Sequence, residues 1–182
     1  LEEAIDAVNK YNADLVIGGV QRVTEEEIDS LTPDKQTTTD IIKVGPDDGR
    51  DTLMAHMIGY TNEMFNIKNG YIGDGPVARV VRRSIASESL FSRESMWSDD
   101  TIWNTKMLKK CENTVIIDDL WYKYLIFPFS KTRRFRPNCP NEFDFRTKQE
   151  LDLFKELWPN CMDGIYVRVF NDIFLFCRRH FI

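Results

Sequence analysis

Two adjacent carboxylates, Asp99 and Asp100, stand where a polar stretch leads into a segment with helical periodicity. Free backbone N–H groups and the positive end of the helix dipole favour an ionised carboxylate at such a position. Consecutive helical side chains point about 100° apart, so one carboxylate can cap the helix while its neighbour faces a cleft. A carboxylate held there can act as a general base toward a hydroxyl group. The alternative, which these residues alone favour, is that Ser98, Asp99 and Asp100 only cap the helix.

Side chains that suit a sugar or a phosphate occur near the two carboxylates. Trp97 and Trp103 flank them in the sequence, and aromatic faces suit the apolar faces of pyranose rings, although core packing is the alternative for Trp103. Arg79, Arg82 and Arg83 lie upstream and can reach a diphosphate or a lipid-linked phosphate through charge-assisted hydrogen bonds. The alternative for these arginines is a solvated strand end.

The hydrophobic pattern predicts a layered α/β domain that positions these residues. Predicted helices cover residues 1–11, 53–66 and 98–110, with a short helix near 25–31 inside a polar excursion. Predicted strands cover residues 15–20, 41–44, 115–117 and 120–127, and residues 77–83 form a strand or a short helix. Two acidic pairs are interpreted as turns, namely Asp118-Asp119 between two strands and Asp47-Asp48 before Gly49, where a metal site is the disfavoured alternative.

The C-terminal part differs in composition from the rest of the chain. Residues 133–146 are rich in arginine and proline and are interpreted as a linker, so the predicted boundaries are 1–132, 133–146 and 147–182. Thr147 and Glu150 have the spacing of a capping box before a helix to Leu157. A last helix opens at Asp163, with an aromatic side opposite a basic one. The aromatic residues are Phe170, Phe174 and Phe181, and the basic residues are Arg168, Arg178 and Arg179. This pattern suits a membrane-surface or partner helix, but packing of the aromatic face on the domain, or on an absent half of the fold, is the favoured interpretation.

Composition limits the classes of function. The 182 residues carry a net charge of −5, which argues against a nucleic-acid partner. Four cysteines without a C-x-x-C pair predict reduced thiols in a cytosolic protein, and no metal site is predicted. No apolar run approaches the ~18 residues of a spanning helix. We therefore expect a cytoplasmic protein, with peripheral contact at the inner face of a membrane through the last helix as the open alternative.

Four segments in order resemble the inverting family 2 glycosyltransferases of the GT-A fold, especially bacterial enzymes that build capsule, cell-wall or exopolysaccharide chains. The opening helix and ADLVIGG at 13–19 resemble the helix and strand that follow the family's nucleotide-sugar metal motif. GPVARVVRRSI at 75–85 is similar to the centre of its acceptor half, and SDDTIWN at 98–104 to its catalytic acidic box. VIIDD at 115–119 with the residues through Ser130 resembles the segment that closes it. The resemblance covers residues 1–132.

The resemblance implies a function for the carboxylates. Asp100 matches the aspartate that deprotonates the acceptor hydroxyl, and Asp99 stands where the family has a glutamate. The implied reaction is inverting transfer of a sugar from a nucleotide-diphosphate donor to a saccharide or lipid-linked acceptor, with Mg or Mn stabilising the leaving diphosphate. Arg79 replaces the family's usual lysine, Trp103 its phenylalanine, and Ala78 its frequent tryptophan.

The family's uridine-binding strands and its D-x-D metal site precede the helix that opens this sequence. We therefore expect an excised or processed piece, a partial GT-A α/β fold with a mixed sheet, flanking helices and a C-terminal helical extension. Such a piece would hold the acceptor side and the base, leave the donor and most metal ligands outside the chain, and be inactive alone. The alternative is a non-catalytic carbohydrate-binding or interaction module that keeps this half-fold.

Overall fold

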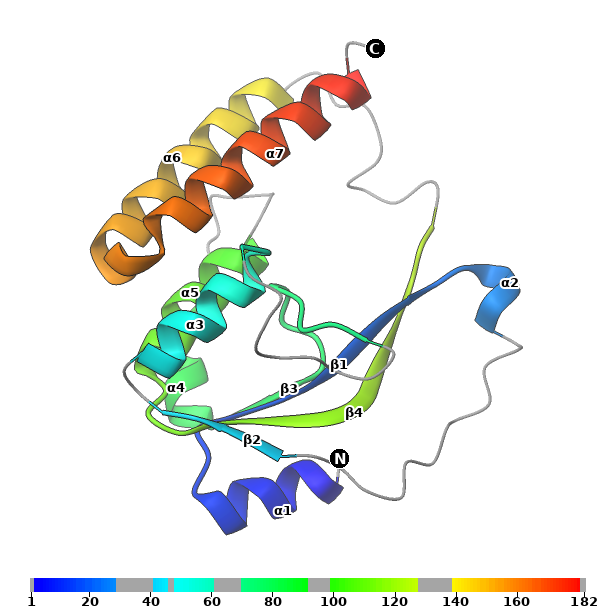
Figure 1. Cartoon of the computed structure of the whole chain (residues 1–182), viewed down its shortest axis with the longest axis vertical. Coiled ribbons are helices and arrows are strands. Elements are labelled where there is room, and N and C mark those ends of the chain that lie inside the picture. The colour runs from blue at the N-terminus through cyan, green and yellow to red at the C-terminus, as the bar shows by residue number, and fades with distance from the viewer. Residues whose placement is uncertain are drawn as a thin grey trace.

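A four-stranded mixed sheet forms the centre of the protein (Figure 1). The computed structural model describes residues 2–28, 41–45, 48–60, 70–91, 99–127 and 139–180. The strands are β1 (Leu15–Val23), β2 (Ile41–Val44), β3 (Arg79–Val81) and β4 (Thr114–Leu125), in the order β2-β4-β1-β3. β1 and β4 are parallel, whereas β2 and β3 run antiparallel to their neighbours at the two edges. The predicted α/β class and mixed sheet are confirmed.

Helices cover both faces of this sheet. Their bounds are α1 (Glu2–Tyr11), α2 (Glu25–Ile28), α3 (Asp48–Met57), α4 (Arg83–Glu88), α5 (Asp99–Lys110), α6 (Cys139–Leu157) and α7 (Met162–His180), with a 3₁₀ turn at Pro159–Cys161. In Figure 1, α1 lies under one face, and α3, α4 and α5 lie on the other. The antiparallel pair α6 and α7 packs beyond α3 and α5, on the side away from the sheet.

The alternation of side chains along the strands divides the core into two layers. Leu15 and Ile17 point to the side of α3 and α5, whereas Val16 between them packs with α1. This follows from the pleat, which sends successive side chains to opposite faces. Both faces are apolar because both are covered, which explains the uninterrupted hydrophobic run of β1.

The helical pair α6 and α7 belongs to the larger of these two layers. Phe154, Trp158 and Ile165 are fully buried in the same cluster as Met107 of α5. The indole N–H of Trp158 also donates a hydrogen bond to the Thr105 carbonyl at 3.2 Å. The last two helices therefore hold the position of α5.

The turn predicted at Asp118-Asp119 is wrong, because β4 continues through it. The register shows the reason: Ile17 lies opposite Ile116 and Gly19 opposite Leu120, so β1 advances by two residues where β4 advances by four. Acidic residues at the bulge produced the turn signal. Gly18 lies at this point, and a Cβ added there would fall 2.1 Å from the ring of Trp121.

Two helix boundaries also differ from the prediction. α3 begins at Asp48 and ends at Met57, so Asp48 and Gly49 of the segment interpreted as a turn are helical. Gly59 follows with a left-handed φ of 77°, and residues 61–66 of the predicted helix lie outside the described residues. α6 begins at Cys139, so residues 139–146 are helical and Thr147 lies inside the helix. Residues 133–138 are also outside the described part of the chain.

We expect Gly18→Ala to destabilise the protein by about 1–3 kcal/mol, because the added methyl group must displace the partly buried ring of Trp121. Chemical denaturation measures this change. Gly45→Ala is the matched control, since no atom lies within 4 Å of its added Cβ. Equal stability of the two variants would contradict the close approach of β1 to Trp121.

Candidate functional site around the start of α5

Asp99 and Asp100 occupy the first two positions of α5, as predicted. The loop before β3 lies against this helix start. Thr101 donates a hydrogen bond from its hydroxyl to the Asp74 carboxylate at 3.0 Å, and the Asn104 amide donates to the Asp74 carbonyl. Asn104 also donates to the carbonyl of Asp100 at 3.0 Å. The first turn of α5 is therefore fixed to Asp74.

An arginine of α7 meets the same carboxylate. Arg168 pairs with Asp74 at 2.6 Å and donates a hydrogen bond to the Thr101 hydroxyl at 3.2 Å. Burial by itself would raise the pKa of Asp74, but the opposing effects of Arg168 and the Thr101 hydrogen bond lower it below the ordinary value of 3.8. Asp74 is therefore held as the anion.

The ion pair continues into α6 and α7 as a chain of alternating charges. Arg168 also lies 3.8 Å from Asp172, which pairs in turn with Arg146. Arg146 reaches both oxygens of Glu150, at 3.2 and 3.4 Å, and Glu150 is only 1% exposed. The predicted capping role of Glu150 is wrong, since its carboxylate binds this arginine inside α6.

A cavity of about 480 Å³ opens beside Asp74. Its walls come from the end of α3, from the loop at 70–74, from β1 and from α7. Polar and aromatic side chains in the wall are Arg22, His56, Tyr71, Asp74, Arg168, Asn171 and Asp172. The Arg22 guanidinium stacks over Tyr71, 5.2 Å from the ring centroid. Hydrogen-bonding groups beside an aromatic ring suit a ligand rich in hydroxyl groups.

Asp100 is exposed at the start of α5, and among the described residues it forms no salt bridge. Its pKa is raised by partial burial and by the neighbouring anions Asp74 and Asp99. Asp99 is half-buried, and its Oδ1 has no hydrogen-bond partner in the described part of the chain. An accessible carboxylate with a raised pKa binds a proton more readily than an ordinary aspartate, which a general base requires.

The structure separates the other predicted contact residues. Trp103 is 8% exposed and stacks on Phe91 with centroids 5.2 Å apart, so it packs in the core. Trp97 lies outside the described residues. The ring of Trp103 therefore has no free face on which a sugar could stack.

The three arginines point to different places. Arg79 donates to the Gly73 carbonyl inside the loop, and burial, which the Asp74 charge opposes, lowers its pKa to about 10. Arg82 pairs with Asp14 at 2.8 Å and holds the start of β1. Arg83 is exposed at the start of α4. Only Arg79 is close to the loop that meets α5.

Sequence reasoning missed Asp74 and expected Arg168 on the outer side of its helix. The available signal for Asp74 was an acid between two glycines, Gly73 and Gly75, a composition typical of a loop. No local signal shows which side of an amphipathic helix faces the domain.

The described residues do not fit a catalytic metal. They contain no group of three or more His, Cys, Asp or Glu side chains that could hold one. Asp47 and the side chain of Asp48 lie outside the described part. We therefore assign no step to a metal in this chain.

Comparisons with known proteins bring no match: no protein-family model and no curated protein matches the chain. Among the described helices, none is long and apolar enough to span a bilayer. What the structure establishes is an α/β protein with a four-stranded mixed sheet, flanking helices and two C-terminal helices.

Asp100→Asn should raise the melting temperature at pH 7, because a raised pKa means that folding disfavours the charged carboxylate. Such a group favours the folded state below its unfolded pKa of 3.8 and loses that contribution as the pH rises through its folded value. The stability that Asp100→Asn adds over the unmodified protein should therefore be complete at neutral pH and vanish below pH 3.8. Thermal melts across this range measure it.

Glu3→Gln is the matched control, since Glu3 is exposed at the second position of α1. Removal of a favourable first-turn charge should lower stability by roughly 0.3–1 kcal/mol. A similar loss in Asp100→Asn would show that Asp100 only supports its helix start.

Proposed function

We propose that this chain is the acceptor-side part of an inverting glycosyltransferase of the GT-A fold, with Asp100 as the general base. The observation that carries the proposal is the exposed carboxyl of Asp100, whose pKa is raised and which no basic side chain pairs among the described residues. A residue that only capped its helix would gain from ionisation. In the folded protein the ionised form of Asp100 is instead disfavoured, which is expected of a functional group.

The order of elements supports the same proposal. An acidic helix start follows the 75–85 segment, and α5 then leads into β4, whose first five residues are buried beside β1. These are the segments of the family resemblance, and they lie next to one another in the fold (Figure 1). The finer assignment to the GT-A fold rests on that resemblance.

In the proposed reaction, an Asp100 carboxylate oxygen accepts the proton of the acceptor hydroxyl. The hydroxyl oxygen then bonds to the anomeric carbon while the bond to the nucleotide diphosphate breaks on the opposite face, which inverts the configuration. General-base assistance of this kind contributes typically ~10²–10⁴ in rate. The donor, and Mg or Mn if required, would be held mainly by residues outside this chain.

The acceptor we propose is a saccharide or a lipid-linked sugar in bacterial polysaccharide biosynthesis, at the cytoplasmic side of the membrane. The cavity beside Asp74 supports this class, because its Tyr71 ring and Asn171 amide suit a sugar. The second candidate, a carbohydrate-binding module without catalysis, is favoured by one observation: Asp100 is absent from the described residues that line this cavity.

The test uses the full-length protein that contains this chain, radiolabelled nucleotide-diphosphate sugars and cell-envelope extract as the acceptor source. We expect Asp100→Asn to reduce sugar transfer by about 10²–10⁴-fold with little change in donor binding. Glu3→Gln controls for the loss of a helix-start charge and should transfer at the normal rate.

Near-normal transfer by a folded Asp100→Asn variant would exclude Asp100 as the base. Retained glycan binding without transfer by the unmodified protein would favour the binding module instead.

A further inference from the structure

Helix α7 presents its apolar face to solvent. The outer stripe consists of Tyr166, Val167, Phe170, Ile173, Phe174 and Cys177, which recur at the spacing of one helix face and are all exposed. Phe170 and Phe174 are 70% and 61% exposed. The opposite side of the helix carries Arg168 and Asp172, which bind inside the protein. The favoured prediction gave the aromatic face two partners, the domain or an absent half of the fold: packing on the described domain is wrong, and packing on an absent half stays a prediction.

An amphipathic helix normally buries its apolar face. Here the ion pairs of Arg168 with Asp74 and of Asp172 with Arg146 hold α7 with its polar side inward, because turning the helix to bury the outer stripe would separate both pairs. A contiguous apolar stripe on a surface marks a site of association. The stripe therefore needs an occupant outside the described fold.

The charges at the two ends of the stripe match a second copy. Asp163 lies at its beginning and Arg178 at its end, both exposed. Phe170 lies midway, seven residues after Asp163 and eight before Arg178. When two copies of α7 cross antiparallel at Phe170, each Asp163 comes next to the Arg178 of the other copy. A twofold interface repeats every such contact, so the stripe is complementary to itself.

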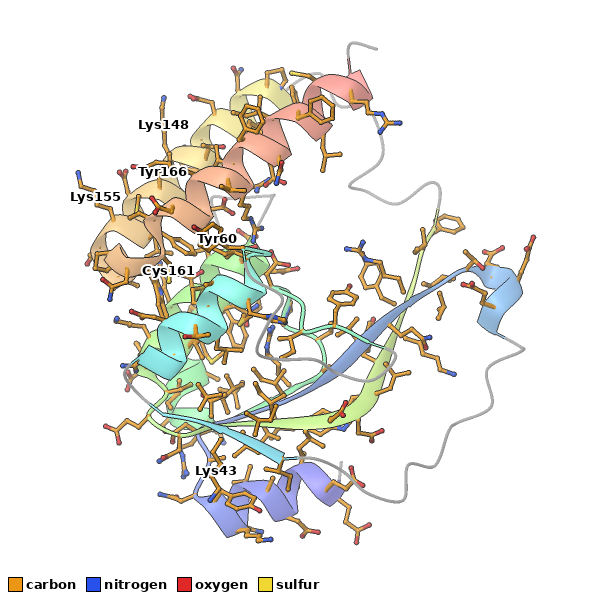
Figure 2. All side chains as sticks on the ribbon, in the orientation of Figure 1. Lys43, Tyr60, Lys148, Lys155, Cys161 and Tyr166 are labelled. Carbon is orange, nitrogen blue, oxygen red and sulfur yellow. The ribbon has the colours of Figure 1, made fainter. Side chains whose placement is uncertain are left out.

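We propose that the outer stripe of α7 is a homodimer interface in which the two helices pack antiparallel across Phe170. The surrounding charge favours this occupant over an anionic membrane. The exposed charged side chains described on α6 and α7 are four acids, Asp144, Asp152, Glu156 and Asp163, and three bases, Lys148, Lys155 and Arg178. Figure 2 shows Lys148 and Lys155 extending away from the rest of the protein. These described side chains carry no excess of bases of the kind that binds anionic lipid.

Sedimentation equilibrium tests the interface in the unmodified protein, which should be a dimer. Phe170→Glu should weaken dimerisation by at least about 100-fold, since it places a charge at the centre of the apolar contact. Phe145→Glu is the matched control: Phe145 is 44% exposed on α6, outside the stripe, and its loss should change dimerisation by less than about threefold. Circular dichroism verifies that both variants fold.

Charge reversal tests the antiparallel arrangement. Asp163→Arg or Arg178→Asp alone should weaken the dimer roughly tenfold, and the double variant should restore it. Cross-linking is the second readout. In the antiparallel dimer the two Cys177 residues lie about 20 Å apart along the helices, at ~1.5 Å per residue, too far for a disulfide. Phe170→Cys, in a background of Cys139→Ser and Cys177→Ser, should form an intermolecular disulfide at the twofold axis.

Four results would overturn the proposal. The first is a monomeric protein at about 100 µM, and the second is a dimer that Phe170→Glu leaves intact. The third is flotation of the monomer with vesicles of phosphatidylethanolamine and phosphatidylglycerol that Phe170→Glu abolishes, which would identify a membrane as the occupant. A Cys177 disulfide in the unmodified protein would exclude the antiparallel arrangement.

Discussion

The ion pair between Arg168 and Asp74 is the contact on which the arrangement of the site depends. It joins the last helix to the loop before β3, and through the Thr101 hydroxyl it reaches the first turn of α5. Both charged groups are partly withdrawn from water, so each needs the other. Without Arg168, Asp74 would lose its ion-pair partner beside two further carboxylates. The pair thus allows three acids to lie together at one helix start.

The same contact accounts for two unusual features, the raised pKa of the exposed Asp100 and the exposed aromatic side of α7. It keeps Asp74 ionised, and that negative charge helps raise the pKa of Asp100, the acid that remains accessible. It also turns the polar side of α7 inward, which leaves the aromatic side exposed. A catalytic proposal at α5 and an association proposal at α7 therefore share one structural cause, although each can fail without the other.

The framework of the fold was predictable from hydrophobic periodicity, because the elements involved bury continuous apolar runs. β1, β2 and α5 lie close to where the pattern places them, and Asp99 and Asp100 open their helix as expected. Errors arose where a local signal competed with a distant partner. The acidic pair in β4 suggested a turn, but Gly18 and Trp121 accommodate a bulge there. Glu150 matched a capping box, yet Arg146 binds it.

The cluster around Asp74 could not be predicted from the sequence for the same reason. Its members come from segments about 27 and 94 residues apart, 74 to 101 and 74 to 168, and only the packing of α6 and α7 brings them together. The spacing of residues in the sequence shows which of them share a face of a helix or strand. Tertiary contacts decide whether that face points into the protein or to solvent. Arg168 illustrates this limit, since its helix was predicted correctly and its side chain was placed on the wrong side.

The central claim is that the two nearby aspartates Asp74 and Asp100 have pKa values shifted in opposite directions. Carboxyl ¹³C NMR titration of the two residues in the folded protein measures this directly. The account predicts a pKa above 3.8 for Asp100 and below 3.8 for Asp74. An Asp100 that titrates at or below 3.8 would contradict it.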